Sequence, residues 1–436
     1  MAQKKYFEIE DPLVERAVLV GVDRGGGAWS LEESLAELER LANTAGAEVV
    51  ATTAQRLDSP HPKTFIGAGK AAEVAEICAS FDADVLIFDD ELSPSQQTNL
   101  EKIVPKSVKV IDRTALILDI FALHATSKEG RLQVRLAQSE YLLPRLRGMW
   151  AHLASNRMGG GVGSRFGEGE SQLEVDRRMV RKRITTIKRE LAHLSEVRDL
   201  QRDTRYKSGV FKVAFAGYTN AGKSSLLNTM TQAEVLSYDK LFATLDSTTR
   251  KFVLPEGREV TLTDTVGFIQ KLPTTLVEAF KSTLDEIVGA DLLLHVIDAS
   301  SQEYEAQIGS VEAVLQQIGA QHIGRVEVFN KIDLLDPASL EAIKARHRRA
   351  LFISALQGEG IEGLVAHIAR VAAASDEHFE VCIPYDRGDL VSLAHERCSI
   401  ICEEHSEAGT CISMLVNAQH AKAFASYRKA GIKELG

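Results

Sequence analysis

The chain has 436 residues, a length that predicts roughly three domains. Hydrophobic residues make up 44% of it and charged residues 26%, with 31 glycines and 10 prolines, so collagen-like, wholly disordered and disulfide-scaffold classes are excluded. The 51 lysines and arginines against 61 aspartates and glutamates give a net charge of −10, which taken alone argues against a nucleic-acid-binding surface.

The five cysteines include no C-x-x-C pair, a usage that indicates neither a zinc site nor a disulfide framework. The first residues, MAQKKYFEIEDP, turn acidic before any apolar core and do not show the pattern of a secretory signal. No apolar run approaches the ~20 residues needed to span a bilayer. We therefore expect a cytoplasmic monomer with no integral membrane association and no DNA partner.

In residues 1–125, short apolar runs alternate with helical spacing. Strands are predicted at 18–22, 47–51 and 85–88, and helices at 31–41 and 71–81. Such alternation is typical of an α/β domain built on parallel strands.

Residues 126–207 have a different texture, with two stretches in which apolar residues recur every three or four positions. This spacing predicts two long helices packed as an antiparallel hairpin. Pro144 lies inside the first helix and should kink it, because it removes a backbone donor. The segment 159–169, GGGVGSRFGEG, holds six glycines and is the predicted loop between the helices.

In residues 208–375, strand and helix alternate again. Strands are predicted at 212–216, 260–263, 292–298, 326–330 and 351–354. Residues 376–436 carry shorter strand-like runs at 379–383, 398–403 and 410–416 and a short helix at 390–396. This last part is predicted to be a small α+β domain.

One motif follows the first of these strands. It reads Gly217-Tyr218-Thr219-Asn220-Ala221-Gly222-Lys223-Ser224 and is followed by an apolar helix. This is G-x-x-x-x-G-K-S in its required strand-loop-helix context, where backbone amides surround phosphate oxygens. Lys223 would place its charge at the β- and γ-phosphates, and the Ser224 hydroxyl would ligate Mg²⁺. An ordinary glycine-rich turn, the alternative interpretation, would not require these flanking elements.

A second motif selects the base. Asn330-Lys331-Ile332-Asp333 follows the strand ending at Phe329. A carboxylate at this spacing accepts hydrogen bonds from N1–H and the exocyclic amine of guanine, whereas adenine offers neither donor there, so adenine would leave a buried carboxylate unpaired. An N-K-x-D loop is common by itself, but behind a P-loop it predicts binding of GTP and GDP.

Two further segments fit the same architecture. Asp264-Thr265-Val266-Gly267 follows a strand, which places a carboxylate to hold Mg²⁺ through water and a glycine amide to sense the γ-phosphate. Ser354-Ala355-Leu356 follows another strand, where backbone amides could meet guanine O6. A plain helix N-cap at Ser354 is the equal alternative for this tripeptide.

In this order, the motifs resemble the translation-factor-like GTPases and, within them, the HflX family, over most of the chain. The segment 241–246, LFATLD, resembles the first switch of that family. DTVGFI, followed by Leu272-Pro273 and by 276–280, LVEAF, resembles the second, and 291–300, DLLLHVIDAS, resembles the next strand. The glycine-rich segment from Gly159 to Arg178 resembles the family's signature.

The resemblance implies a GTP hydrolase that binds the large (50S) ribosomal subunit and its RNA and acts in splitting, rescue or assembly of ribosomes. It implies that Thr244 ligates Mg²⁺ in the triphosphate state and that the GTP site includes Phe242, Ala243, Thr244, Leu245 and Asp246. The fold class expected is α/β multidomain. A P-loop GTPase domain at 208–375, with a mostly parallel sheet flanked by helices, follows an α/β domain and an antiparallel two-helix hairpin and precedes a small α+β domain.

For hydrolysis, the expected catalytic residues are Lys223, Thr244, Gly267 and Asn220. Many GTPases orient the attacking water with a glutamine where this chain has Phe268, whose ring we expect only to pack as a hydrophobic wall. We therefore expect slow intrinsic turnover, with polarisation supplied by the ribosome or by K⁺ held partly by Asn220, as the P-loop resembles those of potassium-assisted GTPases. A hydrogen bond within the loop is the alternative role of Asn220.

Charge is uneven along the chain. Residues 126–207 hold 18 lysines and arginines against 10 acidic residues, a net +8, and the rest hold 33 against 51, a net −18. The candidates for RNA contact are Arg165, Phe166, Arg177, Arg178, Arg181, Lys182 and Arg183. The alternatives are a solvated coiled-coil flank for the basic residues and a flexible hinge for the glycine-rich loop.

Two other functions remain open. Residues 65–70, FIGAGK, are glycine-rich and precede a helix, which would suit an RNA-remodelling factor with a second, ATP-dependent activity, although the spacing is not that of a P-loop. A GTP-gated signalling switch that binds a protein effector is the other alternative.

Overall fold

The computed structural model describes residues 14–26, 29–146, 166–207, 210–231, 241–242, 247–273, 276–277, 280–374 and 376–428. Its contacts divide the chain into two compact units. The first contains residues 1–191, 240–243 and 271–280, and the second contains 192–239, 244–270 and 281–436.

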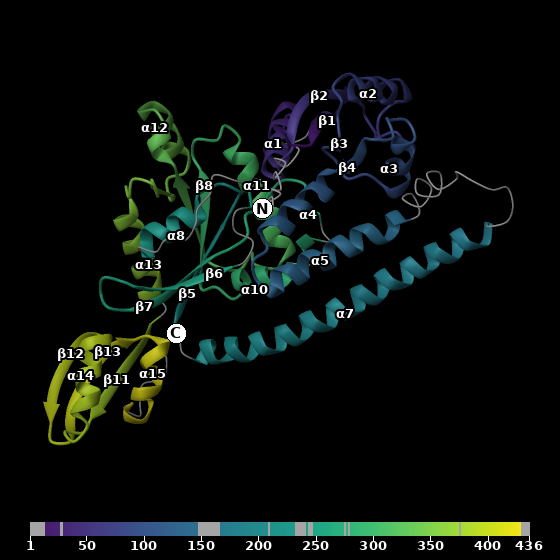
Figure 1. Ribbon diagram of the computed structural model, residues 1–436. Helices are drawn as coiled ribbons and strands as arrows, with labels where there is room; N and C mark the ends of the chain where they lie inside the picture. Colours follow the sequence, from purple (N-terminus) through teal and green to yellow (C-terminus); the bar gives the residue numbers. More distant parts are fainter. Residues whose placement is uncertain are drawn as a thin grey trace, which may run out of the picture. The chain divides into compact units, whose positions relative to one another are not determined.

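The first unit is built around a four-stranded parallel sheet of order β2-β1-β3-β4 (Figure 1). Its strands are β1 (Arg16–Asp23), β2 (Glu48–Arg56), β3 (Val85–Phe88) and β4 (Lys109–Asp112), and its helices are α1 (Leu31–Thr44), α2 (Ala68–Ser80), α3 (Pro94–Glu101) and α4 (Arg113–His124). The buried core joins Val18 and Val20 of β1, Leu86 and Phe88 of β3 and Val74 of α2. The predicted α/β domain on parallel strands is therefore confirmed, and β4, α3 and α4 are additions to it.

Helix α1 shows how local sequence sets these boundaries. The Ser30 hydroxyl accepts from the Glu33 amide at 3.2 Å, and the Glu33 carboxylate accepts from the Ser30 amide at 3.0 Å. This capping box satisfies backbone donors that the first turn of a helix leaves without intrahelical partners. Leu35, Leu38 and Leu41 then fall on one buried face.

Two further helices follow in the chain, α5 (Lys128–Leu142) and the 42-residue α7 (Phe166–Lys207). Pro144 interrupts the helix at the expected place, and Leu146 is helical again. The helix ends at Leu142 and continues as a single 3-10 turn, Leu143–Arg145, because proline has no N–H for the α-helical hydrogen bond. Residues 159–165 of the predicted loop lie outside the described residues. Its last four residues, 166–169, belong to α7.

A buried charge network holds the first unit together. Arg113 is 2% exposed and donates to Asp89 Oδ1 at 2.6 Å and to Glu37. Asp89 Oδ2 also accepts from the Ser34 hydroxyl at 2.6 Å and from Lys271 Nζ at 2.5 Å. Burial by itself would raise the pKa of Asp89, but the charges of Arg113 and Lys271 outweigh it and hold that pKa below its usual value.

An aromatic cluster adds to the same unit. The Phe121 ring of α4 makes edge contacts with Phe242 at 4.5 Å and with Phe280 at 4.8 Å between ring centroids. Phe242 lies in the first predicted switch segment, and Phe280 is the last residue of the second. The first unit therefore includes parts of both segments, through these rings and through Lys271.

The second unit contains a six-stranded sheet of order β10-β9-β8-β5-β7-β6 (Figure 1). Its strands are β5 (Phe211–Gly217), β6 (Thr248–Val253), β7 (Glu259–Asp264), β8 (Leu292–Asp298), β9 (Arg325–Asn330) and β10 (Leu351–Phe352). All neighbouring pairs are parallel except β6 with β7. This agrees with the predicted GTPase-type fold, a mostly parallel sheet flanked by helices.

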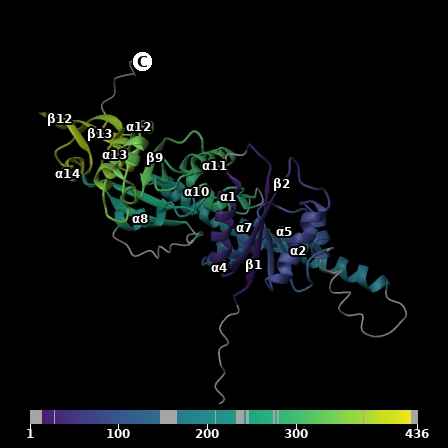
Figure 2. The same cartoon turned by 90° about the horizontal axis from the view of Figure 1, so that it is seen from above.

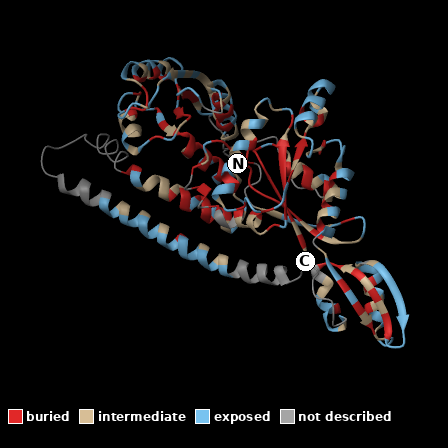
Figure 3. Ribbon diagram, turned by 180° about the vertical axis from the view of Figure 1, so that it is seen from behind, coloured by how far each residue is buried: buried red, intermediate tan, exposed pale blue. Residues whose placement is uncertain are grey.

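Helices cover this sheet, and its central strands are buried (Figure 3). The helices are α8 (Lys223–Thr231), α10 (Lys281–Val288), α11 (Tyr304–Gln317), α12 (Pro337–Arg346) and α13 (Ile361–Ala374), and a 3-10 turn, η2, spans Ile332–Leu334. Helices α8 and α13 share one core cluster with β5, β7 and β8, and α11 and α12 share another with the ends of β8 and β9.

The chain continues into a three-stranded antiparallel sheet of order β11-β13-β12. The elements are β11 (Glu377–Ile383), α14 (Gly388–Arg397), β12 (Ser399–Ser406), β13 (Gly409–Val416), α15 (Ala418–Phe424) and a 3-10 turn η3 (Ala425–Tyr427). Helix α14 lies beside this sheet (Figure 2). Its Leu390 and Ala394 belong to one core cluster with buried side chains of β11 and β13. The predicted α+β character of this part is confirmed. Within the described part of the chain, no helix is both long and apolar enough to cross a membrane.

The Asp89 network leads to a stability prediction. Asp89→Asn removes one charge from a buried group of ions, so we expect a loss of roughly 3 kcal/mol in the free energy of unfolding, measured by urea denaturation. Because the pKa of Asp89 is held low, its stabilisation is complete at neutral pH and is lost only as the pH falls below about 4. Glu312→Gln, which breaks an exposed pair with Arg325, is the control and should cost less than about 0.5 kcal/mol. Equal losses in the two variants would contradict the buried-network account.

Candidate nucleotide site

The parallel register of the six-stranded sheet assembles the predicted site residues at one edge. Phe215 of β5 pairs with Asp264 of β7, and Asp298 of β8 pairs with Asn330 of β9. Because β5, β7, β8 and β9 all run in the same direction, their carboxyl ends meet at the same edge, as in other open α/β sheets with ligand sites. The phosphate, metal and base motifs therefore share that edge.

The P-loop needs glycine at both ends for lack of space. A Cβ on Gly217 would lie 2.3 Å from the Val296 carbonyl oxygen of β8. A Cβ on Gly222 would lie 2.2 Å from Asn330 Nδ2, and Gly222 also has a φ of +90°, which side chains disfavour. The loop thus runs against the neighbouring strands and turns directly into α8.

Lys223 opens α8, and its side chain is 6% exposed. Its ammonium donates to the carbonyls of Tyr218 at 2.8 Å and Gly217 at 3.1 Å, so it lies over the loop that it follows. Burial lowers the pKa of Lys223 to about 8, although the negative charge of Asp264 opposes this. The ammonium is therefore charged at neutral pH and is held where the motif places phosphate.

Ser224 and Asp264 come together as a candidate metal site. The Ser224 hydroxyl donates to Asp264 Oδ2 at 2.5 Å, and Asp264 is fully buried at the end of β7. Mg²⁺ is usually bound by one or two protein oxygens plus phosphates and water. A hydroxyl beside one carboxylate fits that requirement, and the described residues contain no larger cluster of His, Cys, Asp and Glu for a protein-only metal cage.

The segment after Asp264 pairs with the P-loop through its backbone. The Thr219 amide donates to the Phe268 carbonyl at 2.7 Å, and the Phe268 amide donates to the Gly217 carbonyl at 3.0 Å. The Tyr218 hydroxyl accepts from the Gln270 amide at 2.8 Å. The Phe268 side chain is 1% exposed, which agrees with its expected role as an apolar wall. The second predicted switch therefore starts in direct contact with the phosphate loop.

Asn330 ties the base motif to two other segments. Its Nδ2 donates to the Ala221 carbonyl of the P-loop at 2.9 Å, and its Oδ1 accepts from the Ala355 amide at 2.9 Å. Lys331 has a left-handed φ of 64°, and its ammonium pairs with Asp298 at 2.6 Å. These contacts use both ends of the Asn330 amide and orient the loop that carries Asp333.

Asp333 is half-buried in η2. Among the described residues it has no hydrogen-bond or ion-pair partner, so both carboxylate oxygens are available to accept from a base. Its neighbours in the N-K-x-D motif are instead committed to internal contacts. The two carboxylate oxygens of Asp333 fit the two donors of guanine, N1–H and the exocyclic amine.

The Ser354-Ala355-Leu356 segment is buried except for Leu356, whose side chain is 87% exposed. Ser354 is not a helix N-cap, because its hydroxyl accepts from the Gln357 amide in a turn and α13 begins only at Ile361. The Ser354 amide donates to the Glu359 carbonyl, and the Ala355 amide to Asn330. A guanine O6 that meets either amide must share or replace that bond.

Several predicted site residues lie outside the described residues. These are Arg165, Ala243, Thr244, Leu245 and Asp246. Phe166 opens α7, but its side chain is not described. Thr265 and Val266 are buried beside Asp264, and the Thr265 hydroxyl donates to the Phe215 carbonyl at 2.6 Å, which fastens the segment to β5.

Two contacts described above carried no sequence signal. The Tyr218 hydroxyl bond to Gln270 and the Lys271 pair with Asp89 join residues whose spacing shows no motif. Residues 65–70 have contacts of their own. The Lys70 ammonium pairs with Glu73 at 2.6 Å and the Gly67 amide donates to Gln55, so this segment is held as the start of α2.

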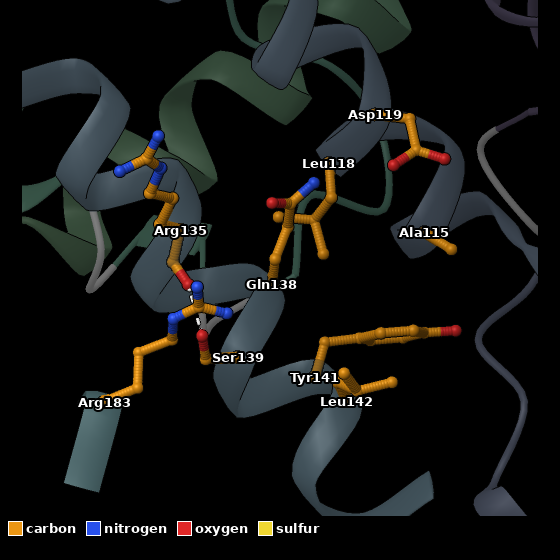
Figure 4. A pocket seen from close by; sticks show the side chains of 9 residues that line it. All are labelled: Ala115, Leu118, Asp119, Arg135, Gln138, Ser139, Tyr141, Leu142 and Arg183. Carbon is orange, nitrogen blue, oxygen red and sulfur yellow. Dashed lines mark hydrogen bonds between the residues drawn. The ribbon is translucent and has the colours of Figure 1, made fainter. Parts of the chain in front are cut away.

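A cavity of about 530 Å³ lies in the first unit beside α4, α5 and α7 (Figure 4). It is lined by Ala115, Leu118, Asp119, Arg135, Gln138, Ser139, Tyr141, Leu142 and Arg183. The Arg183 side chain reaches from α7 toward Ser139 of α5, and the Tyr141 ring forms another wall. The pKa of Asp119 is raised, chiefly because burial removes water from its carboxyl group. One candidate RNA-contact residue, Arg183, is thus at the rim of a formed hollow.

Family models match about two thirds of the chain, in three parts. The model described as GTP-binding GTPase N-terminal matches residues 32–122, GTP-binding GTPase Middle Region matches 124–205, and 50S ribosome-binding GTPase matches 212–331.

Curated relatives match over similar lengths. The GTPase HflX of Caldanaerobacter subterraneus is 47% identical over 93% of this chain and 92% of its own, and that of Escherichia coli K12 is 42% identical over 87% and 88%. A GTP-binding protein of Sulfolobus solfataricus, solved with GDP, is 24% identical with a TM-score of 0.41 and covers 82% of this chain and 98% of its own. The chain belongs to the HflX family of GTPases.

The lowered pKa of Lys223 predicts a pH-dependent affinity for nucleotide. Phosphate binds the protonated ammonium, so the Kd for GTP should rise by about tenfold per pH unit once the pH exceeds about 8. Fluorescent-nucleotide titrations between pH 7 and 9 measure this. Lys223→Arg carries a guanidinium that does not titrate in this range and should lose the dependence. A wild-type affinity that is flat over this range would contradict the assignment.

Proposed function

We propose that this GTPase of the HflX family binds the large ribosomal subunit in its GTP state and acts on ribosomes. GTP hydrolysis itself follows from family membership. The single observation that supports the ribosomal partner is a run of exposed basic residues in the described part of α7, and the description of the family model over 212–331 as a 50S ribosome-binding GTPase agrees with it.

Basic residues on α7 lie one turn apart from each other. Arg177 and Arg181 are four residues apart, and so are Arg178 and Lys182. Like charges at this spacing repel and destabilise a helix, whereas a merely solvated flank usually alternates signs. Within the described part of α7, the exposed Arg178, Arg181, Lys182 and Arg183 have no ion-pair partner. Such a face suits the phosphate backbone of RNA.

GTP would be held by the residues gathered at the sheet edge. We assign the phosphates to residues 217–224, with Lys223 at the β- and γ-phosphates, and the guanine to Asp333. Mg²⁺, used generally by GTPases, would be held by Ser224 and Thr244, with Asp264 acting through water. When bound, it neutralises charge on the transferred phosphate.

Loss of the γ-phosphate would be read by the switch segments. Gly267 and Thr244 would contact that phosphate, so its release should free residues 241–250 and 268–273. The pairing of Phe268 with the P-loop gives the second switch a defined position from which to move.

We propose four domains, residues 1–125, 126–207, 208–375 and 376–436. The proposed location of the protein is the cytoplasm. In this division the hairpin of 126–207 meets RNA and the segment 208–375 supplies the nucleotide switch. Arg165 and Phe166 remain proposed RNA contacts of the glycine-rich loop.

Co-sedimentation with purified 50S subunits tests the ribosomal role. Binding should require a non-hydrolysable GTP analogue rather than GDP and should weaken steeply as salt rises from 50 to 200 mM, by roughly 10³-fold for six or more phosphate contacts. Arg178→Glu combined with Arg181→Glu should weaken binding and flatten the salt dependence.

The matched control reverses two exposed arginines next to α12, Arg348→Glu with Arg349→Glu, and changes the net charge by the same amount. It should bind like the parent chain. Binding that ignores both nucleotide and salt, or equal losses in the two double variants, would rule out α7 as the contact.

A monovalent-cation requirement is a separate proposal. Asn220 has a left-handed φ of 60° and an exposed side chain at the P-loop position used by potassium-assisted GTPases. We expect GTP turnover in KCl to exceed turnover in NaCl by about tenfold and Asn220→Ala to remove the difference. Equal turnover in the two salts would leave the ribosome as the source of activation.

A further inference from the structure

Thr219 carries a hydroxyl that the fold buries and does not satisfy. The residue is 7% exposed, and its Oγ1 has no hydrogen-bond partner among the described residues. A buried hydroxyl without a partner forfeits the hydrogen bonds that water would give it. Such exceptions in a folded protein call for a reason, and a functional contact is one of them.

The surroundings of Thr219 place it at the terminal-phosphate end of the site. A Cβ on Gly267 would lie 2.9 Å from Thr219 Cα, 3.0 Å from Thr219 Cγ2 and 3.2 Å from Lys223 Nζ. Thr219 therefore packs against the glycine expected to sense the γ-phosphate and beside the ammonium expected at the β- and γ-phosphates. The other two P-loop hydroxyls have partners, because Ser224 donates to Asp264 and the Tyr218 hydroxyl accepts from the Gln270 amide.

The backbone amide of Thr219 has a hydrogen-bond partner, whereas its side-chain hydroxyl has none among the described residues. Its amide donates to the Phe268 carbonyl at 2.7 Å and so belongs to the pairing with the second switch. Its hydroxyl is left for another partner. Phe268 stands where a polar side chain would otherwise assist hydrolysis, and its buried ring offers no hydrogen bond.

We propose that Thr219 is a catalytic residue whose hydroxyl donates a hydrogen bond to an oxygen of the terminal phosphate of GTP. A hydroxyl donating to an ionised oxygen makes a short, charge-assisted bond, which is strongest where the charge builds up. Thr219 would thus supply polar contact that the apolar Phe268 cannot. The proposal rests on GTP hydrolysis by the chain and is independent of the ribosome.

A valine at this position separates function from packing, because it has the shape of threonine without the hydroxyl. Thr219→Val removes a buried unsatisfied group, so the apparent melting temperature of the nucleotide-free protein should rise. The same change should slow single-turnover GTP hydrolysis by roughly ten- to a hundredfold. It should weaken binding of a non-hydrolysable GTP analogue by about tenfold and leave GDP affinity within about twofold.

Two variants complete the test, all in ribosome-free buffer. Thr219→Ser keeps the hydroxyl and should hydrolyse GTP within about threefold of the parent chain. Thr231→Val removes a hydroxyl that already donates to the Leu227 carbonyl at 2.7 Å, and should lower the melting temperature without changing turnover. A more stable Thr219→Val that hydrolyses GTP at the parental rate, or equal losses for GDP and the GTP analogue, would overturn the proposal. Failure to bind ribosomes would not affect this result.

Discussion

The parallel alignment of β5 with β7 and β8, and of β8 with β9, is the constraint on which the nucleotide site depends. Parallel strands bring their carboxyl ends to one edge, and each of these strands is followed by a motif loop. Gly217, Asp264 and Asn330 are separated by dozens of residues in the chain and become neighbours only through this register. Close packing at that edge then explains the two P-loop glycines, since a side chain at either would collide with β8 or with Asn330.

The same edge concentrates polar groups where water is excluded, and the fold handles them in different ways. The Lys223 ammonium is satisfied by two loop carbonyls, and Ser224 by Asp264. Asp89 of the first unit is a separate case, in which Arg113 and Lys271 balance a buried carboxylate. Thr219 alone among the P-loop side chains named here keeps a buried polar atom with no described partner, which is why its hydroxyl stands out as functional.

Net charge is distributed unevenly along the chain. The overall charge of −10 conceals a segment of net +8, and α7 displays its arginines on an exposed helix with few acidic partners. Like charges one turn apart do not stabilise the helix itself, which agrees with the proposed contact to RNA. Arg183 and Tyr141 also line a cavity in this region, a feature that hydropathy patterns do not reveal.

The sequence by itself determined the fold class, most strands of the three sheets (β4 and β6 excepted), the P-loop and the guanine motif, because these depend on local periodicity and on short motifs with fixed spacing. It also placed a disturbance of the helix at Pro144, and the structure gives its form, a 3-10 turn over Leu143–Arg145 between α5 and the helical Leu146. Only the tertiary structure decided that the Ser354 and Ala355 amides are already engaged, that Tyr218 reaches Gln270, and that Lys271 pairs with Asp89 across 182 residues of sequence. Those contacts join residues far apart in the chain, and no local pattern encodes which distant groups packing will bring within a hydrogen-bond length.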